Sequence, residues 1–90
     1  MRKPELAAAI AEETGLSKNK AQEVLNAVTD QISNALAQNE SVSLPGFGNF
    51  SIRKRSARTG RNPQTGASIR IPASRSVGFK AGKPLREAVN

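Results

Sequence analysis

Basic side chains dominate the second half of this sequence. The segment from residue 41 to residue 86 contains ten Lys and Arg residues and no Asp or Glu. Guanidinium and ammonium groups bind phosphate through charge-assisted hydrogen bonds, whereas Mg²⁺ binding and general base catalysis would require carboxylates in the same segment. The pattern therefore indicates a surface that binds a polyanion, and it argues against an enzyme that processes nucleic acid.

Several chemically versatile residue types are absent. The sequence contains no Cys, His, Tyr or Trp, which excludes disulfides, thiolate nucleophiles, imidazole bases and most transition-metal sites. We therefore predict a protein that is not an enzyme and that has no metal site and no cofactor. The absence of Cys is typical of a reducing compartment. Because no secretory signal or membrane-length apolar run is present either, we expect a cytoplasmic location.

The net charge of +7 is distributed unevenly along the chain. Residues 1–40 contain four bases and six acids and have a net charge of −2, whereas residues 41–86 have a net charge of +10. A nucleic acid is the partner that this surplus favours, and an anionic membrane is the alternative. The second half is therefore expected to carry the partner surface.

The acidic half predicts two helices. Pro4 suits the first turn of one helix, and Gly15 suits the position after its last turn. Ser17 can cap a second helix, which continues to Gln38-Asn39 over about 20 residues, or about 30 Å. Its apolar positions recur with helical spacing and are Ala21, Val24, Leu25, Val28, Ile32, Ala35 and Leu36.

Alternating polar and apolar residues after Asn39 predict a β-hairpin. Residues 41–44 and 49–52 are its strands, and Pro45-Gly46-Phe47-Gly48 is its turn. A phosphate-binding P-loop is the alternative for the Gly-Phe-Gly segment. The Lys-Ser/Thr pair and the following helix of a P-loop are missing, so we expect a tight turn that holds Phe47 against the core.

Residues 53–75 predict a long basic arm. They have too few apolar residues to pack on a core, and a turn-forming Asn-Pro-Gln-Thr-Gly sequence lies at their centre. A fold about this turn places Arg53 near Arg75 and Arg58 near Arg70. Because like charges that face each other across two strands repel, we expect an arm that is poorly ordered until a polyanion neutralises it.

The predicted core is too small for a monomer. Without the arm, under about 70 residues remain, and domains of that size rarely fold without metals, disulfides or partners. We therefore predict a dimer. Its core is expected to contain Leu25, Val28, Ile32, Leu36, Phe47, Phe50 and Phe79.

The chain is predicted to be one α+β domain, residues 1–90. Two N-terminal helices are followed by a small antiparallel sheet, a protruding β-hairpin arm and a short C-terminal helix that Pro84 opens. The predicted parts are the helical dimerisation part at 1–40, the sheet body at 41–52 and 76–82, the arm at 53–75, which is expected to bind the nucleic acid, and the C-terminal helix at 83–90.

Two motifs in the hairpin and the arm are specific enough to indicate a family. They are Gly46-Phe47-Gly48-Asn49-Phe50 and Arg58-Thr59-Gly60-Arg61-Asn62-Pro63-Gln64-Thr65-Gly66. With them, nearly the whole chain resembles the family of bacterial histone-like DNA-binding proteins that comprises HU and integration host factor. The opening helix of this chain and its ending at Asn90 are more similar to HU than to integration host factor.

The resemblance implies an intertwined homodimer whose two arms wrap DNA through the minor groove and bend it, with Pro63 of each arm wedged between base pairs. It also implies largely sequence-nonspecific binding of double-stranded DNA, which compacts and organises chromosomal DNA in the bacterial nucleoid. Bent, nicked or deformable duplex should be preferred, because DNA shape governs such binding. A heterodimer with a paralogous subunit stays open.

The resemblance implies a set of DNA contacts on the arm and the body. These residues are Lys3, Arg53, Arg55, Arg58, Arg61, Asn62, Pro63, Arg70, Arg75, Lys80 and Lys83.

Three simpler interpretations compete with this one. Pro63 is by itself most often a turn former. The two N-terminal helices could form a helix-turn-helix reader, but residues 18–38 have no excess of positive charge for the major groove, so they are predicted to be scaffold. A membrane-binding protein would use a basic amphipathic helix, which the sequence lacks, so no membrane partner is expected.

Overall fold

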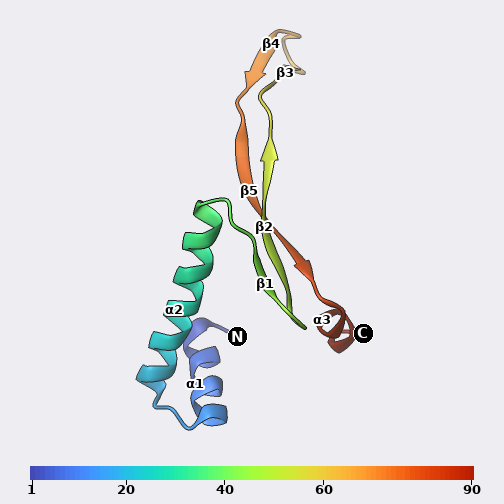
Figure 1. The fold of residues 1–90 in the computed structure, drawn as a ribbon. Coiled ribbons are helices and arrows are strands. Elements are labelled where there is room, and N and C mark those ends of the chain that lie inside the picture. Colours follow the sequence, from blue (N-terminus) through green and yellow to red (C-terminus); the bar gives the residue numbers. More distant parts are fainter.

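The computed structural model describes residues 1–90, which form three helices and five strands. The helices are α1 (Lys3–Thr14), α2 (Lys18–Ala37) and α3 (Lys83–Ala88), and the strands are β1 (Val42–Leu44), β2 (Gly48–Arg55), β3 (Arg58–Arg61), β4 (Ser68–Ile71) and β5 (Ser74–Ala81). Figure 1 shows the helices α1 and α2 at one end of the molecule and a long two-stranded arm at the other. The predicted α+β class and element order are confirmed.

Local signals determine the helix ends. Gly15 adopts φ +78° and its N–H binds the carbonyl of Ala11, which ends α1. The hydroxyl of Ser17 accepts a hydrogen bond from the N–H of Lys20 at 3.1 Å, which caps α2. Because a left-handed residue after one helix and a side-chain cap before the next are local features, the three-residue connection was predictable from the sequence.

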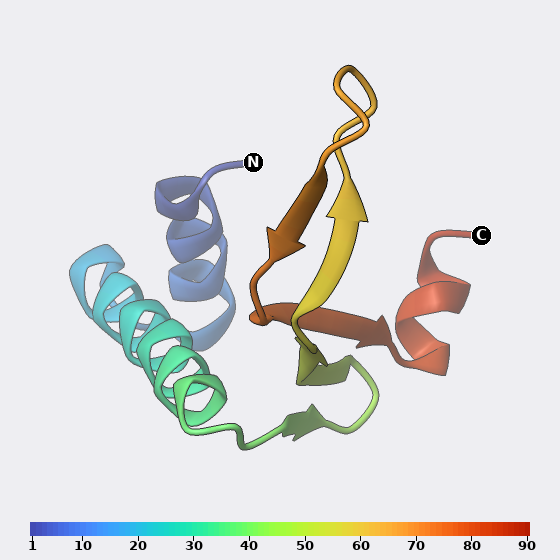
Figure 2. The ribbon, with the colours of Figure 1, turned by 90° about the horizontal axis from the view of Figure 1, so that it is seen from above.

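A three-stranded antiparallel sheet in the order β1-β2-β5 forms the body. In the view of Figure 2, α1 and α2 lie on one side of these strands and α3 lies on the other. Gly48 lies opposite Ala81, and a Cβ atom there would come within 2.6 Å of both the Phe79 ring and the carbonyl oxygen of Lys80. Only glycine fits where the hairpin packs so closely against β5.

The arm extends far beyond the body. Strands β2 and β5 leave the body together, and β3 and β4 continue them to the tip as a two-stranded antiparallel sheet. The molecule measures 60 × 30 × 27 Å, and its radius of gyration is 19.1 Å. A compact chain of this length would have a radius of gyration of about 12 Å. The arm therefore projects into solvent, as its composition predicted.

The predicted pairing of the arm strands is wrong by one residue. Arg53 lies opposite Ser76, and Arg58 lies opposite Ile71, whereas a fold about Pro63 and Gln64 was expected to place these arginines near Arg75 and Arg70. The cause is the tip, where the N–H of Asn62 binds the carbonyl of Ala67 and the N–H of Gly66 binds the carbonyl of Asn62. These bonds centre the turn between Gln64 and Thr65, one residue later than a fold about Pro63 and Gln64.

One chain buries very little. Only six of 90 residues are buried, and the hydrophobic ones are Ala7, Ala11, Ala21 and Leu36. Large apolar side chains remain exposed, among them Val28 at 46% and Phe79 at 42%. A stable small domain buries most of its apolar surface, so these faces need a partner chain.

Candidate nucleic-acid interface

The arm presents exposed cations that have no carboxylate partner. All seven Lys and Arg side chains between residues 53 and 75 are exposed. The two ion pairs of the structure are Lys20–Glu23 at 3.5 Å and Lys83–Glu87 at 3.9 Å, and both lie outside the arm. Free guanidinium groups on a projecting ribbon are available to phosphates.

Strand alternation separates the basic residues onto two faces of the arm base. Side chains two residues apart on a strand point the same way, and cross-strand partners share a face. Arg53 and Arg55 therefore lie on the face of the β2–β5 ribbon that is turned away from α2, which we call the outer face. Ser76 and Gly78 lie on the same face. Lys80 belongs to this outer face too. The structure therefore brings Arg53, Arg55 and Lys80 together on one surface that continues from the body into the arm.

Arg53 lies against the backbone of β5. A Cβ atom at Gly78 would be 2.6 Å from Nε and 3.2 Å from Cζ of Arg53. The missing side chain of Gly78 thus leaves space for the guanidinium across the neighbouring strand. This packing limits the freedom of the Arg53 side chain before any ligand binds, and less conformational entropy is then lost on binding.

The distal part of the arm divides its arginines between both faces. In the β3–β4 ribbon, Arg58 lies opposite Ile71, and Arg70 lies opposite Thr59. By strand alternation, Arg61 and Arg70 share one face and Arg58 shares the other with the two isoleucines. A strand of nucleic acid that follows the arm can therefore meet a guanidinium on either face.

Hydrogen bonds within the tip hold Pro63 at an exposed corner. The side-chain oxygen Oδ1 of Asn62 accepts a hydrogen bond from the N–H of Gln64 at 2.9 Å, and Gly66 adopts φ +72°. This is an Asx turn, in which Asn mimics a backbone group. Pro63 is exposed, while Asn62, a predicted DNA contact, has its Oδ1 engaged in shaping the turn.

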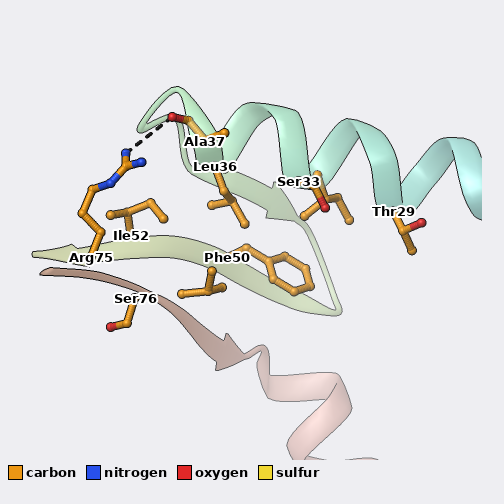
Figure 3. A pocket seen from close by; sticks show the side chains of 10 residues that line it. Thr29, Ser33, Leu36, Ala37, Phe50, Ile52, Arg75 and Ser76 are labelled. Carbon is orange, nitrogen blue, oxygen red and sulfur yellow. Dashed lines mark hydrogen bonds between the residues drawn. The ribbon is translucent and has the colours of Figure 1, made fainter.

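Arg75 is placed differently from the other arm arginines. Its register puts it on the face of Val77 and Phe79, which is the face toward α2. Its Nη1 donates a hydrogen bond to Oδ1 of Asn39 at 2.8 Å and another to the carbonyl of Ala37 at 3.4 Å. Figure 3 shows the guanidinium at the end of α2, with the bond to Ala37 dashed.

An apolar groove lies beside Arg75, between α2 and the inner face of β2 and β5 (Figure 3). Its apolar lining residues are Ile32, Leu36, Ala37, Phe50, Ile52 and Val77. Three of the seven predicted dimer-core residues are in this list. Phe79 connects the other two phenylalanines, since its ring centroid is 4.8 Å from that of Phe50 and 5.6 Å from that of Phe47. Leu25 packs on the α1–α2 cluster, and Val28 stays exposed.

The remaining predicted contacts lie on the body. Lys3 is the first residue of α1, in the helical part, and Lys83 is the first residue of α3. Lys83 lies in an exposed i,i+4 pair with Glu87, and such a pair has little strength, so its ammonium group stays available. No helix is long and apolar enough to cross a bilayer.

Two residues of the site were not singled out from the sequence. Lys54 is exposed between Arg53 and Arg55, and its place in the acid-free run was a sufficient signal. Asn39 receives the Arg75 guanidinium. The only sequence signal for Asn39 is its position just after a helix, where Asn often adopts the left-handed conformation.

Comparison with known proteins gives concordant similarities. A family model described as bacterial DNA-binding protein matches residues 1–90. The chain is 60% identical to DNA-binding protein HU-alpha of Pseudomonas aeruginosa over 90 residues, which is 100% of both chains. It is 55% identical to DNA-binding protein HU-1 of Halalkalibacterium halodurans over 89 residues, 99% of each chain.

Solved structures agree with these sequence similarities. The structure of Anabaena HU in a cocrystal with DNA matches with a TM-score of 0.86 and 45% identity, and the match covers 99% of this chain and 97% of that one. HU from Thermotoga maritima matches with a TM-score of 0.70 and 28% identity over 100% of both chains. Both similarities include the projecting arm, because they extend over nearly the full length.

Proposed function

The chain belongs to the HU family of bacterial DNA-binding proteins, and from this premise we propose that it is an architectural protein that binds and bends double-stranded DNA with little dependence on base sequence. The observation that carries the proposal is the arm, whose exposed cations have no carboxylate partner. Phosphate neutralisation of this kind supplies the sequence-independent part of DNA affinity.

The shape of the arm fits the minor groove. A two-stranded ribbon offers Arg side chains on both faces, and the minor groove distinguishes mainly A·T from G·C pairs. The arm has few Asn and Gln side chains with which to read bases. Sequence-dependent shape and deformability of the duplex should therefore govern the choice of site, so bent or nicked DNA is the preferred ligand.

Pro63 is proposed to be the bending element. Its ring is exposed at a corner that the Asn62 side chain and Gly66 hold in one conformation. A rigid apolar group at the end of a basic arm can replace base stacking at a kink, which costs a few kcal/mol per unstacked step. The simpler role of Pro63 as a turn former would leave the DNA unbent at that step.

The functional unit is a homodimer. The apolar groove and the exposed Val28 and Phe79 leave more apolar surface than a monomeric domain tolerates. Two arms from one dimer would contact DNA on both sides of the body. A heterodimer with a paralogous subunit would use the same faces.

The proposed DNA contacts divide the chain into parts with different tasks. Residues 1–40 serve mainly dimerisation, residues 41–52 and 76–82 form the body, residues 53–75 form the arm, and residues 83–90 form the terminal helix. The proposed contacts are Lys3, Arg53, Arg55, Arg58, Arg61, Asn62, Pro63, Arg70, Lys80 and Lys83. We propose a binding protein rather than an enzyme, and one that compacts chromosomal DNA in the bacterial nucleoid, within the cytoplasm.

One binding series tests the proposed function. Linear duplex, the same duplex with a central nick, and anionic lipid vesicles are titrated under identical salt conditions. The expected order of affinity is nicked duplex, then linear duplex, with no saturable binding to vesicles. Tighter binding to vesicles than to DNA would contradict the proposal, and equal affinity for both duplexes would contradict the preference for deformable DNA.

A further inference from the structure

Arg75 ties the base of the arm to the end of α2. Its Nη1 hydrogen bonds reach Asn39 and Ala37, which lie 36 and 38 residues away along the chain. Among the hydrogen bonds that involve a side chain, these two are the only ones that join residues more than four apart. We call this contact the arm clasp.

The helix end is well suited to receive a guanidinium. α2 has no basic residue in its own last turn, although the partial negative charge and free carbonyl groups of a helix C-terminus favour a cation there. Arg75 supplies that cation from β5. Its Nη1 carries two N–H groups, which match two acceptors, the carbonyl of Ala37 and Oδ1 of Asn39.

Asn39 is held in a fixed conformation. It adopts φ +61°, the left-handed region that Asn tolerates better than most residues. Its N–H binds the carbonyl of Leu36, and the N–H of Glu40 binds the carbonyl of Ala35. The hydrogen bonds that end α2 thus hold the acceptor, Asn39, in place. The donor, Arg75, is held by the pairing of β5 with β2.

We propose that Arg75 is a positioning residue, and that the arm clasp sets the direction of the arm relative to the helical body and through it the angle of the bound DNA. The second half of this proposal rests on the proposed function, whereas the first half does not. The guanidinium is occupied at the end of α2 and lies on the inner face, so it is removed from the set of phosphate contacts that the resemblance implies.

The clasp is at the position where a small rotation has the largest effect. About ten residues separate Arg75 from the tip, which corresponds to about 33 Å of strand. A rotation of the arm base by about 10° would therefore move Pro63 by about 6 Å at this strand length. This displacement exceeds the spacing of adjacent base pairs, so arm direction determines which base step the tip reaches.

A spin-label experiment without DNA tests the clasp itself. The chain has no Cys, so a Gln64→Cys substitution places one nitroxide on each arm tip of the dimer, and electron–electron dipolar spectroscopy measures the distance between tips. Arg75→Ala and Asn39→Gly should each broaden the distance distribution at least twofold. Asn39→Gly keeps the left-handed backbone and removes one of the two acceptors. The double variant should be no broader than Arg75→Ala alone, which already removes both hydrogen bonds.

Two controls make this measurement specific. Asn39→Asp keeps an acceptor at the same place and should keep the distribution narrow. Arg70→Ala removes an arm arginine that has no hydrogen bond to the body and should leave it unchanged. If Arg75→Ala and Asn39→Gly both keep the parental distribution, the arm clasp does not position the arm.

A second experiment separates positioning from DNA contact. Arg75→Ala should change the bend angle, measured by energy transfer between dyes at the duplex ends, while the slope of log affinity against log salt stays at the parental value. Arg70→Ala should make that slope shallower by about 1.8 in a dimer, since two contacts are lost at about 0.9 each. An equal loss of slope in Arg75→Ala would overturn the proposal and return Arg75 to the phosphate contacts.

The two experiments fail in different ways. If the parent protein does not bind DNA, the proposed function is wrong, and the tip-to-tip distances still decide whether the clasp positions the arm. If the parent binds and bends DNA and the Arg75 and Asn39 variants bend it to the same angle, the clasp does not control the DNA, and only the inference is wrong.

Discussion

The salt dependence of DNA binding can be worked out from the arginines of the arm. Outside the arm clasp, five arginines lie on each arm: Arg53, Arg55, Arg58, Arg61 and Arg70. All are exposed and none has an ion-pair partner. A homodimer therefore presents ten of them. At about 0.9 per neutralised phosphate, these arginines should contribute about −9 to the slope of log affinity against log salt concentration, and any phosphate contact of the body lysines would make it steeper.

This slope predicts a large effect over an accessible range. Raising the salt concentration from about 50 to 200 mM should weaken binding by about 10⁵-fold. Fluorescence anisotropy of a dye-labelled duplex, titrated at five or more salt concentrations, measures the slope directly. Arg58→Ala should make it shallower by about 1.8 because each arm loses one contact. Gln64→Ala, an uncharged change at the tip, is the matched control and should keep the parental slope.

Two results would refute this reasoning. A parental slope shallower than about −4 would mean that fewer than half of the ten arginines neutralise phosphates. A slope that is unchanged in Arg58→Ala would remove that residue from the interface, although the structure leaves its guanidinium free.

Three further predictions concern the dimer, the helix cap and the tip. Sedimentation at micromolar concentration should give twice the chain mass of 9.5 kDa, and a folded monomer would contradict the shared core. Phe50→Ala should destabilise the dimer by about 3 to 5 kcal/mol in chemical unfolding, because the Phe50 ring packs on Phe79 and lines the apolar groove. Ser17→Ala should lower the free energy of unfolding by about 1 kcal/mol through loss of the α2 cap, and Ser17→Asp, which restores an acceptor, should recover most of it. Pro63→Ala should reduce the bend angle measured by energy transfer and the preference for nicked DNA, with a smaller change in affinity for straight duplex; full bending by this variant would leave Pro63 as a turn former only.

The parts of the fold that were predictable from sequence depend on neighbouring residues. Pro4, Gly15 and Ser17 act within one helical turn of their own positions, and the Phe47 turn is enclosed by two short alternating strands. The projection of the arm follows from composition alone, because a stretch with almost no apolar side chain has nothing to bury.

The arm register and the arm clasp could not be predicted in the same way. The register depends on which tip groups form hydrogen bonds, and a shift of one residue in the strand pairing changes every cross-strand neighbour. The clasp joins two residues 36 positions apart. Its acceptor is aimed by the left-handed conformation of Asn39, which composition and periodicity do not reveal.

The corrected register also changes the electrostatics of the arm. The predicted pairing would have placed arginine opposite arginine, whereas the observed pairing gives Arg53 a serine neighbour and Arg58 an isoleucine neighbour. One directly opposed pair of like charges remains, Lys54 and Arg75. Like charges in this position destabilise a ribbon.

The arm clasp offsets that remaining repulsion. It directs the Arg75 guanidinium toward a carbonyl oxygen and an amide oxygen at the negative end of α2, so a favourable partner lies beside the unfavourable one. The hydrogen bonds that hold the arm base therefore also stabilise the Arg75 charge, at the only position where two cations lie directly opposite each other across the strands. Asn39→Gly, which leaves the Arg75 charge without its amide acceptor, should broaden the tip-to-tip distribution. Adding Lys54→Gln, which removes the opposed cation, should narrow that distribution again. A double variant as broad as Asn39→Gly alone would contradict this account of the repulsion.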